Sequence, residues 1–407
     1  SLYEEDAALW QSFQSWRVPT KSHVPDTLDD APAPLGYLGG LGPAQEQHSC
    51  TLLFDVTQDC NLACPTCFVG CAPGDDRYAR PADILRTLDT VLEREGGRLD
   101  LVMLSGGEPT LHPDLPSLID EILGREVTRV IVNTNGVRLA RDDELLGVLA
   151  DRRKRVEVYL QYDGPEANTY QELRGADLAG QKEAAIARLS AARVFTTLAC
   201  TVAAGVNEDS LGDVADLALA TDHCGGVVFQ PMFGMPVPDP LERMTSTGVL
   251  RRLDEQSDGP LQSADFLPIP CSHPDCATVN YLVRTDSGAW KSGTELRGRD
   301  RIREHLGMVG NRLVPDDETW NAVVSLYSGS MSVAREDILD HLGVLTGACR
   351  LDLGTFARLL GRSIRGRRAG VEDVAARVRR FSVKGFMDHW TLNIERLRQC
   401  CVHVGSI

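Results

Sequence analysis

The sequence predicts an α/β fold in which parallel strands and the helices between them form a partial (β/α)6 barrel. From Thr51 onward, short runs rich in Val, Ile and Leu alternate with longer helical stretches. This alternation is typical of right-handed βαβ units and of a parallel sheet. In addition, a motif of polar, glycine or cysteine residues follows each of the first three predicted strands. Because ligands of parallel α/β folds bind where the carboxyl ends of the strands meet, these motifs predict a site at one rim of the barrel.

The elements of this barrel can be placed from the pattern of apolar residues. Strands are expected near 51–57, 100–104, 128–133, 155–162, 194–202 and 226–230. Helices are expected near 81–96, 114–124, 141–151, 179–192 and 208–221. Residues 1–50 are interpreted as a lead-in that packs on the core through an amphipathic piece from Ala7 to Val18. The barrel then covers residues 51–231, and residues 232–407 form a C-terminal region.

Composition narrows the class of protein. The 407 residues are 43% hydrophobic and 25% charged, as in globular proteins. A net charge of −16 argues against a general nucleic-acid binder. No run of eighteen apolar residues and no signal peptide is visible, so we expect no transmembrane segment and a cytoplasmic location. In that compartment, the twelve cysteines indicate metal binding or catalysis and not disulfides.

Three of the cysteines follow the first predicted strand at CxxxCxxC spacing: Cys60, Cys64 and Cys67. Three thiolates in one loop can hold a [4Fe-4S] cluster and leave one of its four irons open to a small molecule. Zinc and buried free thiols are the alternatives, although zinc usually takes two separated pairs of ligands. Disulfides fit poorly because cysteines this close in one loop strain the S–S geometry.

Two further motifs, in the expected order, carry a family resemblance. Ser-Gly-Gly-Glu-Pro at 105–109 follows the second predicted strand, and Asn-Thr-Asn-Gly at 133–136 follows the third. Together with the cysteine loop they resemble the radical S-adenosylmethionine (radical SAM) superfamily, over residues 51–231. The resemblance implies a [4Fe-4S] cluster at the three cysteines, S-adenosyl-L-methionine as its ligand, and an electron donor such as flavodoxin or ferredoxin. One departure is Thr66, which stands where the family usually has an aromatic residue, with Phe68 just beyond.

The residues expected to bind S-adenosylmethionine lie in or just after predicted strands. Glu108 is the expected partner of the ligand's ammonium group, and the glycines before it allow a close backbone approach. Asn207 is either a ribose contact or a helix cap. The full set is Gly106, Gly107, Glu108, Asn133, Thr134, Asn135, Gln161, Asp163, Asn207 and Phe68.

The C-terminal region contains paired cysteines that predict at least one auxiliary [4Fe-4S] cluster, with zinc or plain thiols as the alternative. The expected ligands are Cys271, Cys276, Cys349, Cys400 and Cys401. The Pro-Cys-Ser-His-Pro loop at 270–274 and the Cys-Cys-Val-His run at 400–403 also resemble the radical SAM group of archaeal tetraether lipid synthase and the methanopterin-biosynthesis methylases. That resemblance implies attack on an unactivated carbon.

The predicted activity is therefore that of a radical SAM enzyme. It would reductively cleave S-adenosylmethionine to a 5′-deoxyadenosyl radical, abstract hydrogen from an unactivated carbon, and form a C–C bond or methylate that carbon. The expected substrate is lipid-like or small and anionic, because an Arg-rich stretch between Leu353 and Phe381 could meet phosphate, although a solvated helix face is the simpler interpretation. Alternatives are a maturase of a ribosomal peptide, disfavoured by the short lead-in, and a non-catalytic iron–sulfur or zinc protein.

Overall fold

The computed structural model describes most of the barrel and parts of the C-terminal region. The described residues are 49, 51–234, 243–257, 259–268, 275–285, 287–297, 306–309, 312–315, 377–388, 391–398 and 400–405. The amphipathic piece at 7–18, Cys271, Cys349 and most of the Arg-rich stretch lie outside them. None of the helices in the described ranges has the length and apolar character needed to traverse a bilayer.

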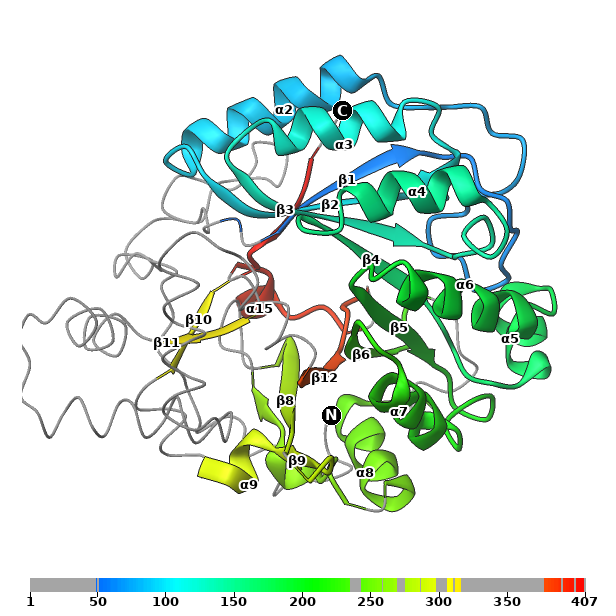
Figure 1. The fold of residues 1–407 in the computed structure, drawn as a ribbon, viewed down its shortest axis with the longest axis vertical. Helices are drawn as coiled ribbons and strands as arrows, with labels where there is room; N and C mark the ends of the chain where they lie inside the picture. The colour runs from blue at the N-terminus through cyan, green and yellow to red at the C-terminus, as the bar shows by residue number, and fades with distance from the viewer. Residues whose placement is uncertain are drawn as a thin grey trace, which may run out of the picture.

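The first six strands run parallel in sequence order and alternate with helices, which confirms the predicted partial barrel. They are β1 (Thr51–Thr57), β2 (Leu99–Gly106), β3 (Val127–Thr134), β4 (Val156–Gln161), β5 (Thr196–Val202) and β6 (Cys224–Pro231). The helices are α2 (Pro81–Arg94), α3 (Leu115–Leu123), α4 (Asp143–Asp151), α5 (Ala167–Arg174), α6 (Ala179–Ala191) and α7 (Leu211–Ala220), with the short η4 (Pro109–Leu111). Figure 1 shows the helices outside the curved sheet. Of these helices, α5 was not predicted.

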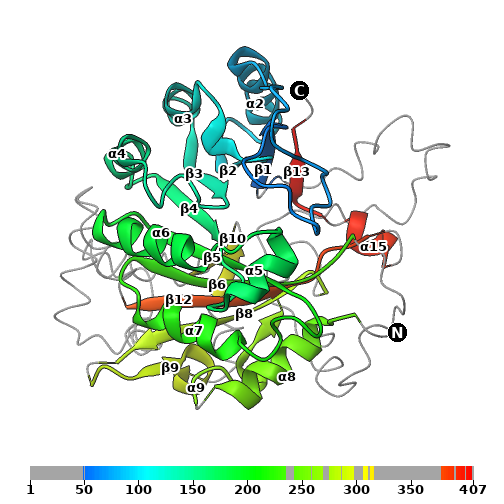
Figure 2. The same ribbon diagram turned by 90° about the vertical axis from the view of Figure 1, so that its right-hand side faces the viewer.

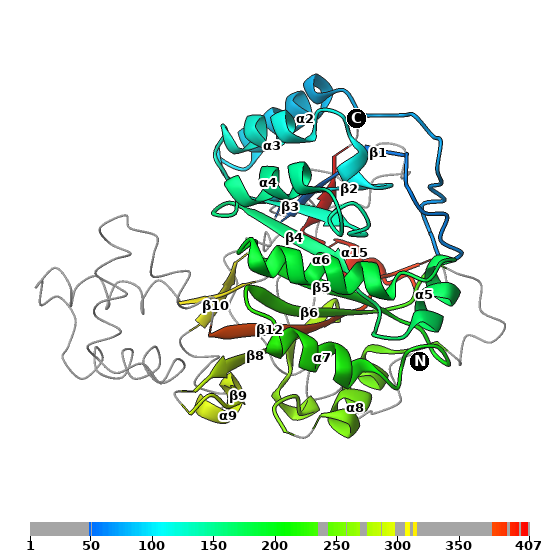
Figure 3. The ribbon, with the colours of Figure 1, turned by 45° about the vertical axis from the view of Figure 1, so that its right-hand side comes forward.

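The sheet continues past residue 231 on both sides. Strand β12 (Val378–Lys384) pairs parallel to β6, and β13 (Val402–Val404) pairs parallel to β1 at the opposite edge. Figures 2 and 3 show β12 beside β6. The chain between these two strands thus connects the two sides of the open barrel through α15 (Ile394–Arg398). The predicted division at residue 231 stays a prediction, since the sheet itself crosses it.

The remaining described elements extend the β12 side. Strand β8 (Ala277–Arg284) pairs antiparallel with β12, and β7 (Leu267–Pro268) and β9 (Trp290–Ser292) pair with β8. The others are α8 (Ser246–Gln256), η6 (Ser263–Asp265), α9 (Gly293–Arg297) and the separate pair β10 (Leu306–Val309) and β11 (Arg312–Pro315).

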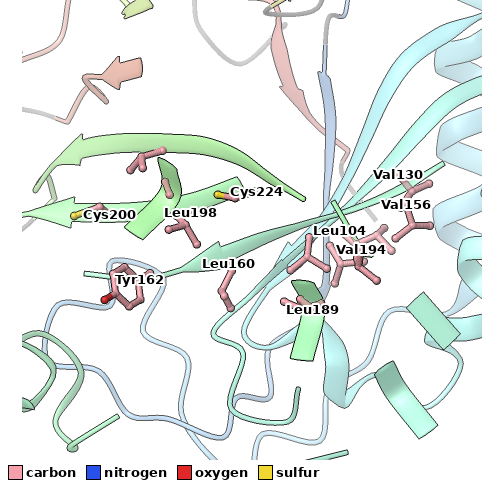
Figure 4. Packing of buried hydrophobic residues seen from close by; sticks show 14 of the residues in the cluster. Leu104, Val130, Val156, Leu160, Tyr162, Leu189, Val194, Leu198, Cys200 and Cys224 are labelled. Carbon is pink, nitrogen blue, oxygen red and sulfur yellow. The ribbon is translucent and has the colours of Figure 1, made fainter. Parts of the chain in front are cut away.

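The two faces of the barrel sheet differ in polarity, since the inward face mixes polar and apolar side chains. Residues that point toward the helices are apolar and buried, and Figure 4 shows Leu104, Leu160 and Leu198 of different strands near Leu189 of α6. Alternate residues point inward, because successive side chains of a strand face opposite sides. Inward positions such as Asn133 are polar and only half-buried. The core therefore lies between sheet and helices, and the barrel interior keeps hydrogen-bonding groups.

Two arginine contacts fix β12 and the chain that follows it. Arg379 is buried and donates hydrogen bonds to the carbonyls of Ala218 and Thr221, at 3.1 and 2.9 Å, where α7 ends. A guanidinium at this position complements the negative end of the helix dipole. Since Arg379 lies in a strand and is buried, the expectation of a solvated helix face is wrong for this end of the Arg-rich stretch. Arg243 forms a buried ion pair of 2.6 Å with Asp388, which pins the chain after β12 beside the loop after β6.

Candidate functional site

The cysteine loop leaves the carboxyl end of β1. The Cys67 amide donates to the Cys64 carbonyl at 3.1 Å, a turn that places both residues on one side of the loop. Burial raises the pKa of Cys60 to about 12, and the nearby Glu108 and Cys64 raise it as well. Burial also raises the pKa of Cys64, while the guanidinium of Arg174 lowers it. The loop thus holds neighbouring thiols in a partly desolvated place that suits a metal cluster, because metal binding displaces the thiol protons.

The thiols are near one another but not assembled. Among the residues that the structure describes, no three Cys, His, Asp or Glu side chains are gathered tightly enough to coordinate one ion. The donor set itself fits an iron–sulfur cluster, since three thiols come from one short loop and their neighbours supply hydrogen-bond donors. One such donor is the side-chain amide of Asn135, whose nitrogen lies 3.9 Å from the Cys60 sulfur.

The two glycines of the Gly-Gly-Glu motif support the cysteine loop. The Gly107 amide donates to the Thr57 carbonyl at 2.7 Å, and the Glu108 amide donates to the Asp59 carbonyl at 2.8 Å. A Cβ at Gly106 would lie 2.3 Å from the Thr57 oxygen, and one at Gly107 would lie 2.1 Å from the Asp59 oxygen. Glycine is thus required for backbone packing against the cysteine loop, a reason additional to the predicted approach of the ligand.

Glu108 is the centre of the hydrogen bonds at this rim. Its carboxylate is 1% exposed. One oxygen accepts hydrogen bonds from the Thr110 amide, the Thr110 hydroxyl and the Thr134 hydroxyl, at 3.1, 2.7 and 2.6 Å. Among the described residues, the other oxygen accepts only from the backbone amide of Asn135, at 2.7 Å. Because each carboxylate oxygen can accept about two hydrogen bonds, this second oxygen retains capacity for a ligand ammonium group.

The Asn-Thr-Asn motif joins Glu108 to the cysteine loop. Thr134 holds the carboxylate, and the Asn135 side chain donates to Asn61 in the loop at 2.7 Å. Asn133 does not share this role. Its side-chain amide donates to the Ser105 hydroxyl at 3.0 Å, on the inward face of the sheet.

A buried lysine that the sequence analysis missed lies behind this motif. The Lys182 ammonium, on α6, is fully buried and donates to the backbone carbonyls of Asn135 at 2.5 Å and Gln161 at 2.9 Å, and to the Gln161 side chain. Burial lowers its pKa to about 7, although the nearby Asp163 raises it. The signal was available, because Lys182 falls on the apolar face of the predicted helix, four residues after Leu178.

Asp163 and Arg174 form a second buried pair. Arg174, also missed, ends α5 and contacts both carboxylate oxygens of Asp163, at 2.7 and 2.8 Å. Asp163 also accepts from the Gln161 side chain and from the Thr201 amide. All of its acceptor capacity is thus engaged, and its predicted contact to ribose stays a prediction. Arg174 lies beside Cys64, so this pair places a positive charge next to the cysteine loop.

The other predicted ligand residues take different positions. Asn207 is buried and connects the segment after β4 to the end of β5, because it donates to the carbonyls of Asp163 and Thr201, at 2.7 and 2.8 Å. It is not the residue that caps α7, because Ser210 holds that position. Phe68 is 65% exposed and packs on Phe233 with ring centroids 4.8 Å apart, and Phe233 in turn stacks on Phe386. The three rings connect the cysteine loop to the chain that crosses between β12 and β13.

Three of the five predicted auxiliary ligands lie close together. Cys276 precedes β8, while Cys400 and Cys401 precede β13. Burial lowers the pKa of Lys384, and these three cysteines raise it, so all three are close to the same ammonium group. Arg396 donates to the Cys276 sulfur at 2.9 Å. The structure thus brings together cysteines that are more than a hundred residues apart.

Comparisons with known proteins agree with this geometry. A family model described as the radical SAM superfamily matches residues 54–218. The 7,8-dihydro-6-hydroxymethylpterin dimethyltransferase of Methanocaldococcus jannaschii is 24% identical over 442 residues, which cover 100% of this chain and 83% of that protein. The mycofactocin maturase MftC of Mycobacterium ulcerans is 31% identical over 180 residues, or 44% of this chain and 45% of the maturase. SuiB of Streptococcus suis, solved with S-adenosylmethionine, is 19% identical with a TM-score of 0.41 over 51% of this chain and 46% of SuiB.

The family match begins in β1 and ends in α7, and so includes the cysteine loop, Glu108 and the Asn-Thr-Asn motif. These three motifs meet at one rim of a parallel partial barrel. Residues 54–218 therefore form a radical SAM domain.

Proposed function

We propose that this radical SAM enzyme methylates an unactivated carbon of a small, hydrogen-bonding substrate. Cys60, Cys64 and Cys67 would hold a [4Fe-4S] cluster, and S-adenosylmethionine would bind between this loop and Glu108. Together, the cluster and S-adenosylmethionine supply the 5′-deoxyadenosyl radical chemistry that activates an inert C–H bond. The chain's own residues bind and orient the ligand and keep water away.

One observation carries the proposal. Within the described part of the chain, the second oxygen of buried Glu108 has a single hydrogen-bond donor, the backbone amide of Asn135, and the Asn135 side chain contacts the cysteine loop. A buried carboxylate with remaining acceptor capacity favours a cation, and the ammonium group of S-adenosylmethionine is such a cation. Arg174, which lies near Cys64, adds a positive charge that would attract the ligand's carboxylate.

The inward face of the sheet favours one of the two expected substrate classes. A lipid chain would leave the hydroxyl protons of Ser105 and Tyr159 and the side-chain carbonyl oxygen of Asn133 without acceptors or donors, at a cost of about 1–3 kcal/mol for each group. A small heterocycle would pair with them. The relative from Methanocaldococcus jannaschii, which covers the full chain, is named as a pterin dimethyltransferase, and this supports a pterin-like substrate and methylation over C–C crosslinking.

The tail cysteines support an auxiliary cluster. Cys276, Cys400 and Cys401 would supply three ligands, and Lys384 and Arg396 would balance part of the negative charge. The predicted contributions of Cys271 and Cys349 concern residues outside the described ranges.

The test is iron content and S-adenosylmethionine cleavage under anaerobic conditions. A Cys60→Ala, Cys64→Ala, Cys67→Ala variant should lose about four irons per chain and all formation of 5′-deoxyadenosine. Cys224→Ala is the matched control, because Cys224 is buried in β6 and belongs to neither group of cysteines. Cleavage that persists in the triple variant would refute the proposal.

A second variant tests the auxiliary cluster separately. Replacing Cys276, Cys400 and Cys401 with alanine should remove about four irons and leave the electron-paramagnetic signature of the first cluster in place. An unchanged iron content would show that these cysteines are free thiols or bind another metal.

A further inference from the structure

A row of side chains crosses the inward face of the barrel sheet, with a gap at Gly226 in β6. Asp55 in β1 pairs with Ser105 in β2, whose hydroxyl contacts Asn133 in β3. Asn133 pairs with Tyr159, Tyr159 with Thr197, and the row ends at Arg380 in β12. Six strands that are far apart in sequence thus contribute hydrogen-bonding groups to the same level of the barrel.

This row lies directly below the residues of the rim. Asn135 and Gln161 follow Asn133 and Tyr159 by two positions, so they lie on the same side of the sheet, one level closer to the carboxyl ends of the strands. Lys182 donates hydrogen bonds to the backbone carbonyls of both Asn135 and Gln161, and so fixes their positions at the rim. A molecule bound at the row would therefore lie beneath S-adenosylmethionine bound at the rim.

The middle of the row has unused hydrogen-bonding capacity. The Ser105 hydroxyl accepts from Asn133 at 3.0 Å, and the Tyr159 hydroxyl accepts from Gln230 at 2.7 Å. Each hydroxyl keeps its own proton to donate, and Asn133 keeps its carbonyl oxygen to accept. Within the ranges that the structure describes, these three groups have no other hydrogen-bond partner.

Asp55 is the most unusual member of the row. Its side chain is half-buried, and burial raises its pKa. In the described part of the chain it forms no hydrogen bond and no ion pair. The carboxylate oxygens of Asp55 are therefore not engaged by the described protein and are not among its buried unsatisfied atoms, so they can accept hydrogen bonds from a ligand.

We propose that Asp55 selects the substrate by binding the two adjacent N–H groups of a 2-amino-4-oxopyrimidine ring, and that Ser105, Asn133 and Tyr159 hydrogen-bond to the rest of the molecule. A carboxylate accepts two parallel hydrogen bonds, which matches the ring N–H and the amino group on this edge. The carbonyl oxygen of such a ring lies on the same edge, next to the ring N–H, and it would accept a hydrogen bond from a donor hydroxyl such as that of Ser105 or of Tyr159, which has the positive charge of Arg380 near it. This assignment rests on the proposed function and identifies Asp55 as the residue that determines which substrate binds.

The experiment compares two probes that differ at this edge. Pterin carries the 2-amino group, whereas lumazine carries a carbonyl oxygen in its place and keeps the ring N–H. Fluorescence titration of each probe would be performed on the anaerobically reconstituted full chain, with S-adenosylmethionine present and no reductant. The wild-type protein should bind pterin at least about tenfold more tightly than lumazine, because the carbonyl oxygen would face a carboxylate.

The decisive variant is Asp55→Asn. Its side-chain amide offers one acceptor and one donor, so it complements lumazine, and the preference should reverse to favour lumazine by about tenfold or more. The substitution removes no internal hydrogen bond of the described structure, so the variant should fold normally. Asp100→Asn is the matched control, because Asp100 lies near the opposite end of β2 and should leave the preference unchanged.

Each outcome decides the proposal. Reversal in Asp55→Asn, with none in Asp100→Asn, supports it. Wild-type protein that binds neither probe, or a variant that keeps the wild-type preference, overturns it. Failure of the wild-type protein to form 5′-deoxyadenosine would count against the proposed function and not against Asp55.

Discussion

Lys182→Met is the perturbation that most directly tests the buried charges behind the site. Methionine has nearly the volume of lysine and no charge, so the packing of α6 is kept while the ammonium group is removed. Burial lowers the pKa of Lys182 from 10.5 to about 7. Between these two values the unfolded chain holds a proton that the folded chain does not. The free energy of unfolding of the wild-type protein should therefore rise with pH across this window.

The magnitude follows from the two pKa values. Each tenfold change in proton affinity corresponds to about 1.4 kcal/mol, so the rise due to Lys182 is on the order of 4 kcal/mol from pH 7 to pH 10. At pH 7 the variant removes this cost but leaves the carbonyls of Asn135 and Gln161 without their donor, at about 1–3 kcal/mol each. These effects nearly balance. The variant should therefore be about as stable as wild type at pH 7 and about 4 kcal/mol less stable at pH 10.

The assay is urea unfolding at pH 7, 8, 9 and 10 of wild type, Lys182→Met and Lys154→Met, all prepared without metal under anaerobic conditions. Lys154 is exposed after α4 and serves as the matched control. Taking the difference from wild type cancels the titration of groups that all three chains share. If Lys182→Met follows a curve parallel to wild type across this range, the ammonium is not desolvated and the reasoning is refuted.

Three further substitutions test other parts of the structure. Asp388→Asn removes the carboxylate that pairs with Arg243 and should cost about 3–5 kcal/mol of unfolding free energy in urea. Burial raises the pKa of Asp388, but hydrogen bonds, with that of the Gly234 amide first, lower it from 3.8 to about 2. The wild-type advantage should therefore be constant from pH 5 to 8 and be lost as the pH falls through about 2. A double variant with Arg243→Met should recover part of the loss, and no recovery would exclude the ion pair as its cause. Gly107→Ala forces the cysteine loop away from β2 and should lower the iron content. Gly147→Ala, at a position with open space around it, should leave the iron content unchanged. Equal iron content in both variants would contradict the claim that Gly107 is needed for the loop to pack. Glu108→Gln should weaken S-adenosylmethionine binding in equilibrium dialysis at least about tenfold at full iron content, since the neutral amide no longer attracts an ammonium, and unchanged binding would remove Glu108 from the ligand site.

Most of the barrel could be predicted because the alternation of apolar runs with helical stretches is visible in short segments of the sequence. The alternation of apolar runs gave β1 at its observed bounds, and the other five strands differ from their predicted bounds by one or two residues. Strands β12 and β13 were missed because both are short segments in the tail whose partners lie more than a hundred residues earlier. Helix α5 was missed because its face is mostly polar, with Tyr170 and Leu173 as its buried anchors.

The site could be predicted only where a motif repeats a known pattern. Glu108 and the cysteine loop were found in this way, and the structure adds what holds them in place. Arg174 and Lys182 carry no motif, and their importance depends on the fold bringing α5 and α6 under the rim. Asp55 sits in a strand that was predicted correctly, but the absence of a partner is a property of three-dimensional structure and has no sequence signal.

The pairing of β13 with β1 has a consequence for biosynthesis. A hydrogen bond between Ser49 and His403 joins residues that are 354 positions apart, so this side of the sheet closes only after residues 402–404 have left the ribosome. Contacts of such long range form late, because the loop between them must be closed first. Throughout synthesis of the six-stranded barrel, β1 therefore keeps a free edge beside the loop that carries Cys60. We expect iron–sulfur assembly factors to have their widest access to that loop during this interval, before the β1–β13 seam forms.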